Sequence, residues 1–202
     1  FVLCGFDTRG TVTEINQQTG EHKRRDILPH ETVWASYEKI FTQDYSIISE
    51  EYKKYLLTYK QDGFENEENQ PYRRVWTLPV TSYAKNYSKF DVSLAPIKNH
   101  LFNRLKSQLK VIEAGFYKKA LIASNIGPYT IDLKHCLENG NFVDGNALLV
   151  DEHRNHSDWA KYIEKLLKNR NMVKDMGERL YETVKDKYDL NIVTKQRAEF
   201  YK

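Results

Sequence analysis

The sequence predicts an α/β fold with a doubly wound, mostly parallel sheet and helices on both faces. Two observations predict it. Residues 90–127 follow the order strand, loop, helix, strand and glycine loop, and strands alternate with helices from residue 72 onward. The chain has 202 residues and no internal repeats, which suits a single domain over residues 1–202 that buries roughly 70% of its unfolded surface.

Residues 90–127 contain the unit around which the rest of the chain is organised. Short apolar runs predict strands at 90–97 and 120–124. Residues 101–116 between them have helical periodicity, and Gly115 is expected to mark the helix end. The apolar stripe expected to face the core consists of Leu105, Leu109, Ile112 and Phe116. Two strands that bracket one helix predict a right-handed βαβ unit.

The polar face of this predicted helix carries the candidates for binding chemistry. Asn103, Lys106, Lys110 and Glu113 follow at intervals of three, four and three residues, and Ser107 lies beside Lys106. Ammonium groups, a hydroxyl group and the amides of a helix start suit a phosphate group. The carboxylate would accept hydrogen bonds from sugar hydroxyl groups. A solvated helix face without a ligand is the alternative.

The first thirty residues predict a strand with a loop at its end. Residues 1–6 form an apolar run typical of a strand buried on both faces. The loop at 7–10 follows its carboxyl end, where open α/β sheets bind ligands. Arg9 is therefore a candidate phosphate ligand, and an exposed surface arginine is the alternative. Residues 11–15 and 22–27 predict either a hairpin or a mobile loop.

The remaining elements follow from apolar periodicity and turn residues. Helices are predicted at 31–41, 46–59, 81–88, 157–168, 171–188 and 191–201, with Ser157 as an N-cap. Strands are predicted at 72–78 and 146–150. Residues 129–138 are expected to form a loop or a short helix, closed by Gly140.

Composition limits the expected partners and compartment. The net charge of +3 is too small to imply a nucleic-acid partner. Cys4 and Cys136 are far apart and indicate no disulfide framework, so a reducing cytoplasm is the expected location. No apolar run approaches the length of a membrane span, and no signal peptide is recognisable. The chain starts at Phe1 inside a predicted strand, which suggests a fragment of a longer protein.

Several common site motifs are absent or misplaced. The sequence has no GxGxxG, GxxxxGK[ST] or GxSxG motif, which argues against a dinucleotide fingerprint, a P-loop and an α/β-hydrolase site. His153 and His156 have no cysteine nearby, so a metal site is not expected there. Asp91 stands at a strand start, whereas a nucleophilic aspartate belongs at the carboxyl end of a strand.

Five segments together resemble the carboxyl-terminal domain of group 1 glycosyltransferases. They are FDVSLAPI, FNRLKSQLKVIEAG, ALIASNIGPY, DGNALLV and DMGERLYETVKDKYD, and the resemblance covers roughly residues 72–188. These enzymes have the GT-B fold, in which two Rossmann-like domains face each other across a cleft and the second domain binds the nucleotide-sugar donor. The resemblance implies that residues 1–6 form the first strand of such a domain. It also implies that residues 11–70 are a family-specific elaboration and that the amino-terminal acceptor domain is absent.

The resemblance implies donor contacts for several residues. Glu113 matches the second of two family glutamates and would hydrogen-bond the ribose, whereas the first glutamate falls at Leu105 and is lost. Lys106 and Ser107 match a Lys-Ser variant, in which Ser107 and the amides of the helix start would contact the donor phosphates. The remaining donor-binding candidates are Asn103 and Lys110 on the same helix face, Thr77 and Leu78 beside the base, and Gly5 and Arg9 near the phosphate-binding loop.

The activity implied by the resemblance is transfer of a hexose-type sugar from a nucleoside diphosphate to a glycan or glycoconjugate acceptor. No cofactor and no divalent metal are expected, because Lys106, Lys110 and the helix start would stabilise the leaving phosphate. The acceptor site, most catalytic contacts and any peripheral membrane association would belong to the missing domain, so the chain alone is expected to be inactive. A degenerate GT-B module with a non-catalytic interaction role is one alternative. An unrelated Rossmann-like enzyme, such as an epimerase that uses nucleotide sugars, is another, and the order of Lys-Ser helix, Gly-Pro loop and paired final helices argues against it.

Overall fold

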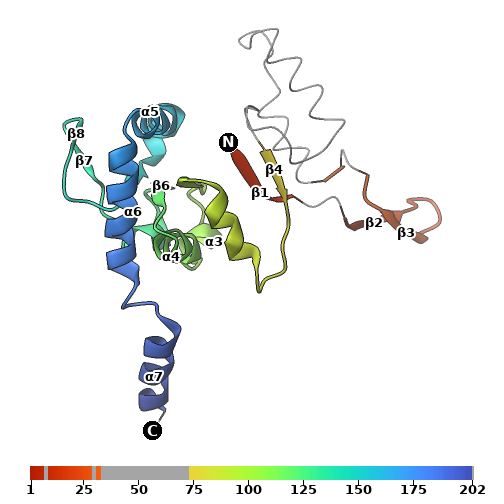
Figure 1. Cartoon of the computed structure of the whole chain (residues 1–202). Coiled ribbons are helices and arrows are strands. Elements are labelled where there is room, and N and C mark those ends of the chain that lie inside the picture. Colours follow the sequence, from red (N-terminus) through yellow and green to blue (C-terminus); the bar gives the residue numbers. More distant parts are fainter. Residues whose placement is uncertain (7–8, 29–30, 33–72, 202) are drawn as a thin grey trace. The chain divides into compact units, whose positions relative to one another are not determined.

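The computed structural model describes residues 1–6, 9–28, 31–32 and 73–201 (Figure 1). The chain divides into two compact units, Phe1–Asn86 and Tyr87–Lys202. The helices predicted at 31–41 and 46–59 lie almost wholly outside the described residues, as does the larger part of the expected elaboration at 11–70.

In the first unit, β1 (Val2–Phe6) pairs in parallel with β4 (Arg73–Trp76), which confirms the strands predicted at 1–6 and 72–78. The register shifts between Cys4 and Phe6, where Gly5 has a φ of 93°. Glycine adopts a positive φ without the steric cost that a Cβ brings. Gly5 therefore allows an irregularity just before the carboxyl end of β1.

A hairpin follows β1 in the chain. It consists of β2 (Thr11–Ile15) and β3 (His22–Asp26), paired antiparallel, so the first of the two predicted alternatives is confirmed. The guanidinium group of Arg25 forms ion pairs with Glu14 of the opposite strand and with Glu31 beyond the hairpin. These charged contacts are exposed, and exposed ion pairs contribute about 0–1 kcal/mol each.

The second unit is built on one parallel sheet. η2 (Tyr83–Lys89), a 3-10 helix where residues 81–88 predicted a short helix, leads into it. The sheet has the strand order β5 (Val92–Ala95), β6 (Ala120–Ser124) and β9 (Leu148–Val150). The predicted strand–helix–strand unit and the α/β architecture are therefore confirmed. The doubly wound arrangement stays a prediction, since this sheet has three strands.

Helices pack against the central strand of this sheet (Figure 1). They are α4 (Leu109–Phe116), α5 (Asn155–Leu167) and α6 (Arg170–Val184). Leu121 and Ala123 of β6 pack with residues of α4 and the second half of α6. Ala120 and Ile122 of the same strand pack with residues of α5 and the first half of α6. Because successive strand residues point to opposite faces, β6 contributes to two separate cores.

The helix predicted at 101–116 is two helices. α3 (Leu101–Arg104) and α4 are separated by four non-helical residues at 105–108. The apolar stripe expected to face the core is also wrong, since Leu105 is 78% exposed and Leu109 is 48% exposed. The buried apolar residues of α4 are instead the smaller Val111, Ala114 and Gly115.

Close packing of α6 on α4 explains why the small residues of α4 face the core. A Cβ added to Gly115 would lie 2.5 Å from Cγ2 of Val184 and 3.2 Å from the backbone oxygen of Leu180. Only small residues allow the two helix backbones to approach this closely, so the larger Leu109 of α4 lies exposed on another side of the helix. Gly115 is therefore a packing residue inside the helix and not the helix stop that its position in the sequence suggests.

The end of α4 is formed by Lys118, which has a φ of 53°. Its amide donates to the Gly115 carbonyl at 2.9 Å, and the amide of Lys119 donates to the Ala114 carbonyl at 2.8 Å. These two bonds are those of a Schellman motif, in which glycine usually occupies the left-handed position. Lys118 occupies that position here, and its ammonium group forms an exposed ion pair with Glu178 at 2.8 Å.

The beginning of α5 differs from the prediction. A short 3-10 helix, η4 (Glu152–Arg154), precedes it, and α5 starts at Asn155. Ser157 is therefore not an N-cap but lies in the first turn, where its hydroxyl donates to the Arg154 carbonyl at 3.2 Å. Asp158 is also in the first turn, and Arg154 donates to both of its carboxylate oxygens at 2.9 and 3.0 Å.

Residues 129–136 form the end of a 3-10 helix and a loop, as predicted, but a second hairpin begins at Leu137, inside the segment predicted to be a loop or short helix. β7 (Leu137–Glu138) and β8 (Asn141–Phe142) pair antiparallel. The two linking residues, Asn139 and Gly140, have φ values of 50° and 80°. Positive φ at both positions is the mark of a type I′ turn, for which Asn-Gly is the preferred sequence. This dipeptide is the signal that would have predicted the hairpin.

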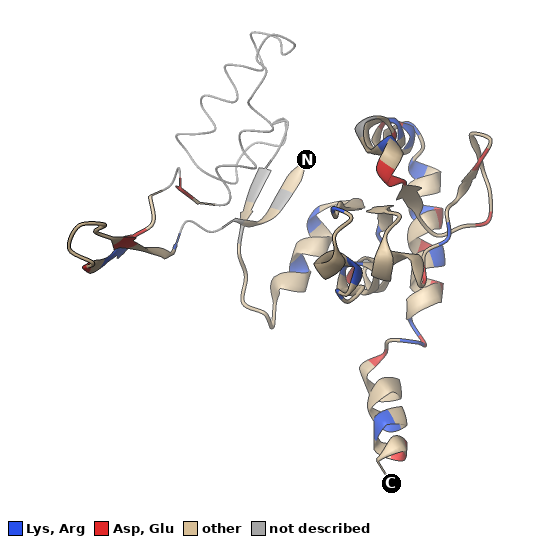
Figure 2. Cartoon of the chain, turned by 180° about the vertical axis from the view of Figure 1, so that it is seen from behind, with Lys and Arg blue, Asp and Glu red and all other residues tan. Residues whose placement is uncertain are grey.

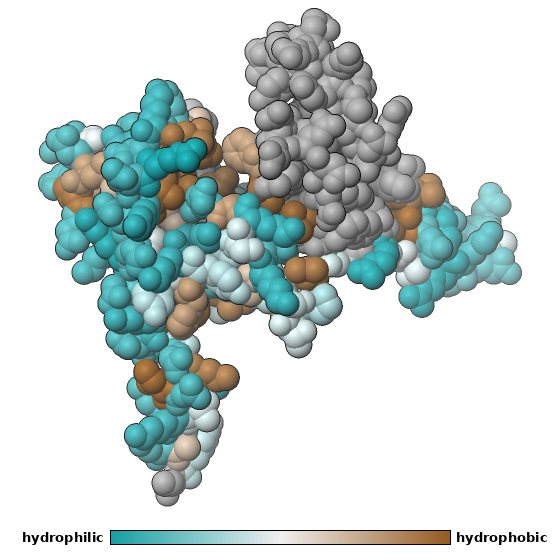
Figure 3. Space-filling model, viewed as in Figure 1, coloured by the Kyte–Doolittle hydropathy of each residue, from teal (hydrophilic) through white to brown (hydrophobic). Residues whose placement is uncertain are grey.

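The chain ends in the helix predicted at 191–201, which is α7 (Leu190–Phe200). None of its residues is buried, and Figure 3 shows apolar residues on its surface. Leu190 and Phe200 of this helix are 76% and 84% exposed. Along α6, residues of both charge signs follow one another (Figure 2). Among the residues that the structure describes, no helix is both long enough and apolar enough to cross a membrane.

Candidate functional site

A pocket of about 450 Å³ lies at the carboxyl ends of β5, β6 and β9. Ligands of open α/β sheets bind at this edge, because the loops that follow parallel strands all meet there. The lining residues are Pro96, Ile97, Lys98, Asn99, Ser124, Ile126, Val150, Glu152 and Asn155. We refer to it as the strand-end pocket.

Side-chain hydrogen bonds join the loops around the strand-end pocket. Asn99, after β5, donates through Nδ2 to Oε2 of Glu152, after β9, at 2.7 Å. The Oδ1 atom of Asn99 accepts from Nε of Arg104 in α3 at 2.7 Å. On β6, the hydroxyl oxygen of Ser124 accepts from the Ile97 amide at 3.0 Å. The pocket wall is therefore held in place by contacts between three separate segments.

The loop after β6 packs tightly against α3. η3 (Gly127–Thr130) begins at Gly127, which has a φ of 53°. A Cβ at this position would lie 2.8 Å from the Cα atom of Arg104 and 3.2 Å from its carbonyl oxygen. Glycine is therefore required here both for the backbone conformation and for the space. This contact fixes the end of α3 beside the strand-end pocket.

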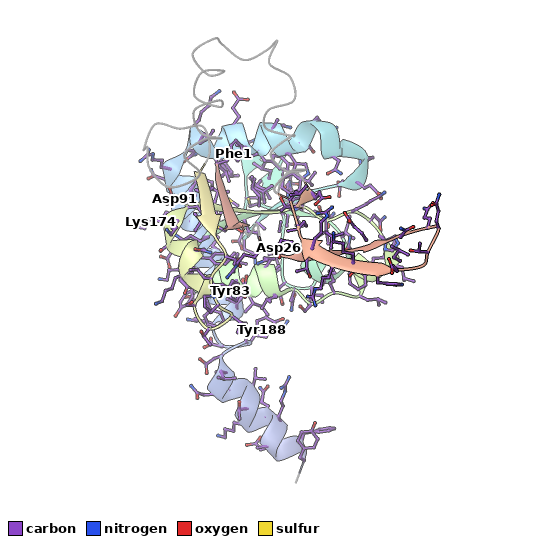
Figure 4. The ribbon with its side chains drawn as sticks, turned by 90° about the vertical axis from the view of Figure 1, so that its right-hand side faces the viewer. Phe1, Asp26, Tyr83, Asp91, Lys174 and Tyr188 are labelled. Atoms are coloured by element: carbon purple, nitrogen blue, oxygen red, sulfur yellow. The ribbon has the colours of Figure 1, made fainter. Side chains whose placement is uncertain are left out.

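Lys106 and Ser107 lie in the break between α3 and α4, and both side chains are exposed. α4 starts at Leu109, with Gln108 as its N-cap. The side chain of Gln108 makes no hydrogen bond to its own helix: Nε2 donates to the hydroxyl of Tyr188, between α6 and α7 (Figure 4), and Oε1 has no hydrogen-bond partner among the described residues. The first amides of α4 therefore have no capping side chain, and such a helix start favours an anion.

The four residues expected on one polar helix face do not share one, because the helix is interrupted between Asn103 and Lys110. Nδ2 of Asn103 donates to the Lys98 carbonyl at 2.8 Å, so Asn103 stabilises the loop after β5. The ammonium group of Lys106 lies 4.8 Å from the ring centroid of Phe102. The prediction of one continuous polar face is wrong, although all four residues stay within the same segment.

Glu113 is buried, with 8% of its surface exposed. Its Oε2 atom accepts a hydrogen bond from the hydroxyl of Tyr87 at 2.8 Å and contacts Nζ of Lys110 at 3.0 Å. Its Oε1 atom has no hydrogen-bond partner among the described residues. Burial raises the pKa of Glu113 to about 7. The pKa of Tyr129 is also raised, by burial and then by the charge of Glu113.

The other four donor-binding candidates belong to the first unit. Gly5 lies within β1, and Arg9 is exposed beyond its carboxyl end. Thr77 and Leu78 directly follow β4 and are half-buried. Because β1 and β4 are parallel neighbours, Arg9 and Thr77 both follow the same edge of that small sheet. The structure thus groups the nine candidates into two sets, one in each unit.

Sequence reasoning missed the residues that line the strand-end pocket. Lys98 and Asn99 follow β5 at the end of a predicted strand, and Glu152 and Asn155 follow β9. Their position in the sequence would have identified them, because polar residues that directly follow buried parallel strands meet at one edge of the sheet. Among the described residues, no group of three or more metal-ligating side chains is present.

Comparison with known proteins assigns no identity to this chain: neither the models of known protein families nor the curated proteins contain a match.

Proposed function

We propose that this chain is the nucleotide-sugar donor-binding domain of a glycosyltransferase that transfers a hexose-type sugar to a glycan or glycoconjugate. One observation carries the proposal: the helix break places Lys106 and Ser107 directly before the uncapped start of α4. A continuous helix would have placed both residues in its middle, where the backbone amides are already bonded. The break leaves a cation, a hydroxyl group and helix-start amides together, and this combination suits a diphosphate.

The chemistry assigned to this segment is stabilisation of the leaving group. Departure of a nucleoside diphosphate builds negative charge on phosphate oxygens, and preorganised amides with an ammonium group stabilise that charge as it develops. Lys106 supplies the ammonium group. Lys110, in the first turn of α4, adds a second cation, although it also contacts Glu113. These residues perform this role without a metal ion.

Glu113 is assigned to the ribose of the donor. One of its oxygens is engaged by Tyr87 and Lys110, and Oε1 is the acceptor that remains. A buried acceptor without a partner costs about 1–3 kcal/mol, so a ligand hydroxyl at Oε1 removes that penalty. In the same proposal, Thr77 and Leu78 meet the base, and Gly5 and Arg9 belong to a phosphate-binding loop of one doubly wound, GT-B-type domain.

The proposed domain acts within a larger enzyme. The acceptor site, most catalytic contacts and any peripheral membrane association come from an amino-terminal domain, and the enzyme works in the cytoplasm. A degenerate module with an interaction role is the second candidate. The observation that favours it is Leu105, which stands where the group 1 glycosyltransferases carry a glutamate. Its side chain is exposed and, unlike a carboxylate, has no atom that accepts a hydrogen bond from a sugar.

Titration calorimetry tests the proposed function. Wild-type chain is titrated with UDP, GDP and inorganic pyrophosphate, alongside Lys106→Ala, Ser107→Ala and Glu113→Gln. We expect saturable binding of one nucleotide, at least tenfold weaker in Lys106→Ala. Pyrophosphate affinity should fall in Lys106→Ala, whereas Glu113→Gln, at the residue assigned to the ribose, should weaken nucleotide binding more than pyrophosphate binding. Lys174→Ala on α6, an exposed lysine (Figure 4), is the matched control. Absence of nucleotide binding, or equal binding by Lys106→Ala and wild type, contradicts the proposal.

A further inference from the structure

We propose that Tyr188 and Asp132 are positioning residues, which hold the side chain of Gln108 away from the start of α4 and so keep that helix start open to an anion. The inference rests on the proposed function for the identity of this anion, the diphosphate of the donor. Its evidence is separate, however, because none of these three residues is a donor-binding candidate. The bond between Gln108 and Tyr188 joins residues that are 80 positions apart in the sequence.

A chain of hydrogen bonds ends at the side chain of Gln108. Nε2 of Gln108 donates to the hydroxyl of Tyr188, which lies between α6 and α7 (Figure 4). The same hydroxyl donates to Oδ2 of Asp132 at 2.5 Å, and Oδ1 of Asp132 contacts Nζ of Lys187 at 2.5 Å. Only 6% of the Asp132 side chain is exposed, so these protein contacts take the place of water around its carboxylate.

The carboxylate of Asp132 decides which end of the Gln108 amide faces Tyr188. A tyrosine hydroxyl has one hydrogen, and an ionised carboxylate can only accept. Because Tyr188 gives its hydrogen to Asp132, its oxygen can only accept from Gln108. Burial and then the bond to Asp132 raise the pKa of Tyr188 above its ordinary value of 10, so the hydroxyl keeps this hydrogen at neutral pH. The donor end of the Gln108 amide is therefore bound, and the acceptor end is left over.

The acceptor end of Gln108 is the end that could cap α4. Its Oε1 atom is buried and has no hydrogen-bond partner among the described residues, which is an unfavourable state for a polar atom. Gln108 stands at the N-cap position, where a side-chain oxygen ordinarily accepts from amides of the first turn. Such a bond would satisfy Oε1, but it would also occupy amides that a phosphate group needs. Tyr188 prevents this by holding Nε2.

The backbone around Tyr188 gives its hydroxyl a fixed position. The amide of Tyr188 donates to the Val184 carbonyl at 3.0 Å, one turn after the end of α6. The next residue, Asp189, caps α7 by accepting from the amides of Asn191 and Ile192. The ring of Tyr188 also packs against the hydrophobic core. This hydroxyl can therefore hold its hydrogen-bond partner in one place without touching the ligand itself.

Pyrophosphate binding in two backgrounds tests the inference. Tyr188→Phe keeps the ring but removes the hydroxyl, so the Gln108 side chain is released to cap α4. We expect Tyr188→Phe to bind inorganic pyrophosphate about fivefold more weakly than wild type in titration calorimetry, which is the effect of one helix cap. In the Gln108→Ala background the same change should have no effect, because no side chain is left to cover the amides. A purely structural role of Tyr188 predicts the same loss in both backgrounds.

Tyr201→Phe on α7, at a tyrosine that is 81% exposed, is the matched control. Urea unfolding verifies that each variant is folded. Pyrophosphate affinity of Tyr188→Phe that equals that of wild type overturns the inference, and so does an equal loss in both backgrounds. Where wild type binds nucleotide and either of these results is found, the proposed function stands and only the positioning role fails.

Hydrogen exchange of the ligand-free chain tests the same inference without any nucleotide. Backbone amides in the first turn of α4 should exchange equally fast in wild type and Gln108→Ala, since Gln108 does not cap the helix. They should exchange more slowly in Tyr188→Phe, where it does. This pattern supports the positioning role even if no nucleotide binds and the proposed function fails. Faster exchange in Gln108→Ala than in wild type overturns the inference, and this comparison does not depend on the folding of Tyr188→Phe.

Discussion

The hydroxyl group of Tyr87 lies 2.8 Å from Oε2 of Glu113 and donates a hydrogen bond to it. The two residues come from η2 and α4, so this bond ties the start of the second unit to the helix beside its sheet. Tyr87 is itself stacked on Tyr117, with ring centroids 5.4 Å apart. Glu113 is thus a buried carboxylate in an aromatic environment, and its protonation is coupled to the stability of the fold.

Glu113→Gln should change how stability depends on pH. The pKa of Glu113 is about 7 in the folded chain, against an ordinary value of 4.5, so between these values the folded form binds a proton that the unfolded form has lost. Stability therefore falls as pH rises from 4.5 to 7, by at most about 3 kcal/mol. Urea unfolding at pH 5, 6, 7 and 8 measures this, and Glu113→Gln should lose that part of the slope. Glu199→Gln serves as the control, and parallel curves for wild type and Glu113→Gln contradict the prediction.

Gly115→Ala should destabilise the chain although alanine is the better helix former. The new Cβ would lie 2.5 Å from Cγ2 of Val184, and overpacking of this kind costs about 1–3 kcal/mol. The higher helix propensity of alanine offsets about 1 kcal/mol of that cost. Val184→Ala removes the clashing methyl groups, so the double variant should be more stable than the sum of the two single effects predicts. Strict additivity in urea unfolding would show that the two helices do not meet as described.

The close contact of α4 with α6 at Gly115 also shows why the sequence predicts the strands better than the buried face of the helix. Strand β6 is predictable because its apolar run is nearly continuous and both of its faces are buried, and β5 is predictable from its short apolar run. The helix face is not predictable from large residues, because Leu105 and Leu109 repeat with helical spacing yet lie exposed. The backbones of α4 and α6 approach each other at Gly115, so the buried face of α4 consists of small residues. A search for periodically spaced large apolar residues does not detect such a face.

The residues of the candidate site also fall into those that the sequence predicts and those that it does not. Lys106, Ser107 and Glu113 are predictable as a group, because charged and polar residues cluster between two strands of one βαβ unit. The helix break that makes Lys106 and Ser107 accessible depends on long-range contacts, such as the bond from Gln108 to Tyr188, eighty residues away. Asn99 and Glu152 are 53 residues apart in the sequence. They meet because the order of the strands in the sheet brings their loops together, and local sequence patterns do not predict that order.

Cys136 should react with thiol reagents only when the chain unfolds. Its side chain is fully buried, and burial raises the pKa of its thiol to about 11, so almost none is thiolate at pH 8. We expect no labelling of the Cys4→Ser variant by a disulfide reagent in native buffer and complete labelling of one thiol in urea. Cys136→Ser, which retains Cys4, is the comparison. Rapid stoichiometric labelling of native Cys4→Ser would place the Cys136 thiol at the surface.

Lys118→Gly should stabilise the end of α4 relative to Lys118→Ala. Both variants lose the ion pair with Glu178 and the contact of the ammonium group with the Tyr181 ring, so their difference isolates the backbone. With a φ of 53°, a residue carrying a Cβ pays roughly 1–2 kcal/mol that glycine avoids. We therefore expect Lys118→Gly to exceed Lys118→Ala by about 1 kcal/mol in the free energy of unfolding, measured with urea. Equal stability of the two variants would mean that the Schellman motif closes α4 without a left-handed residue.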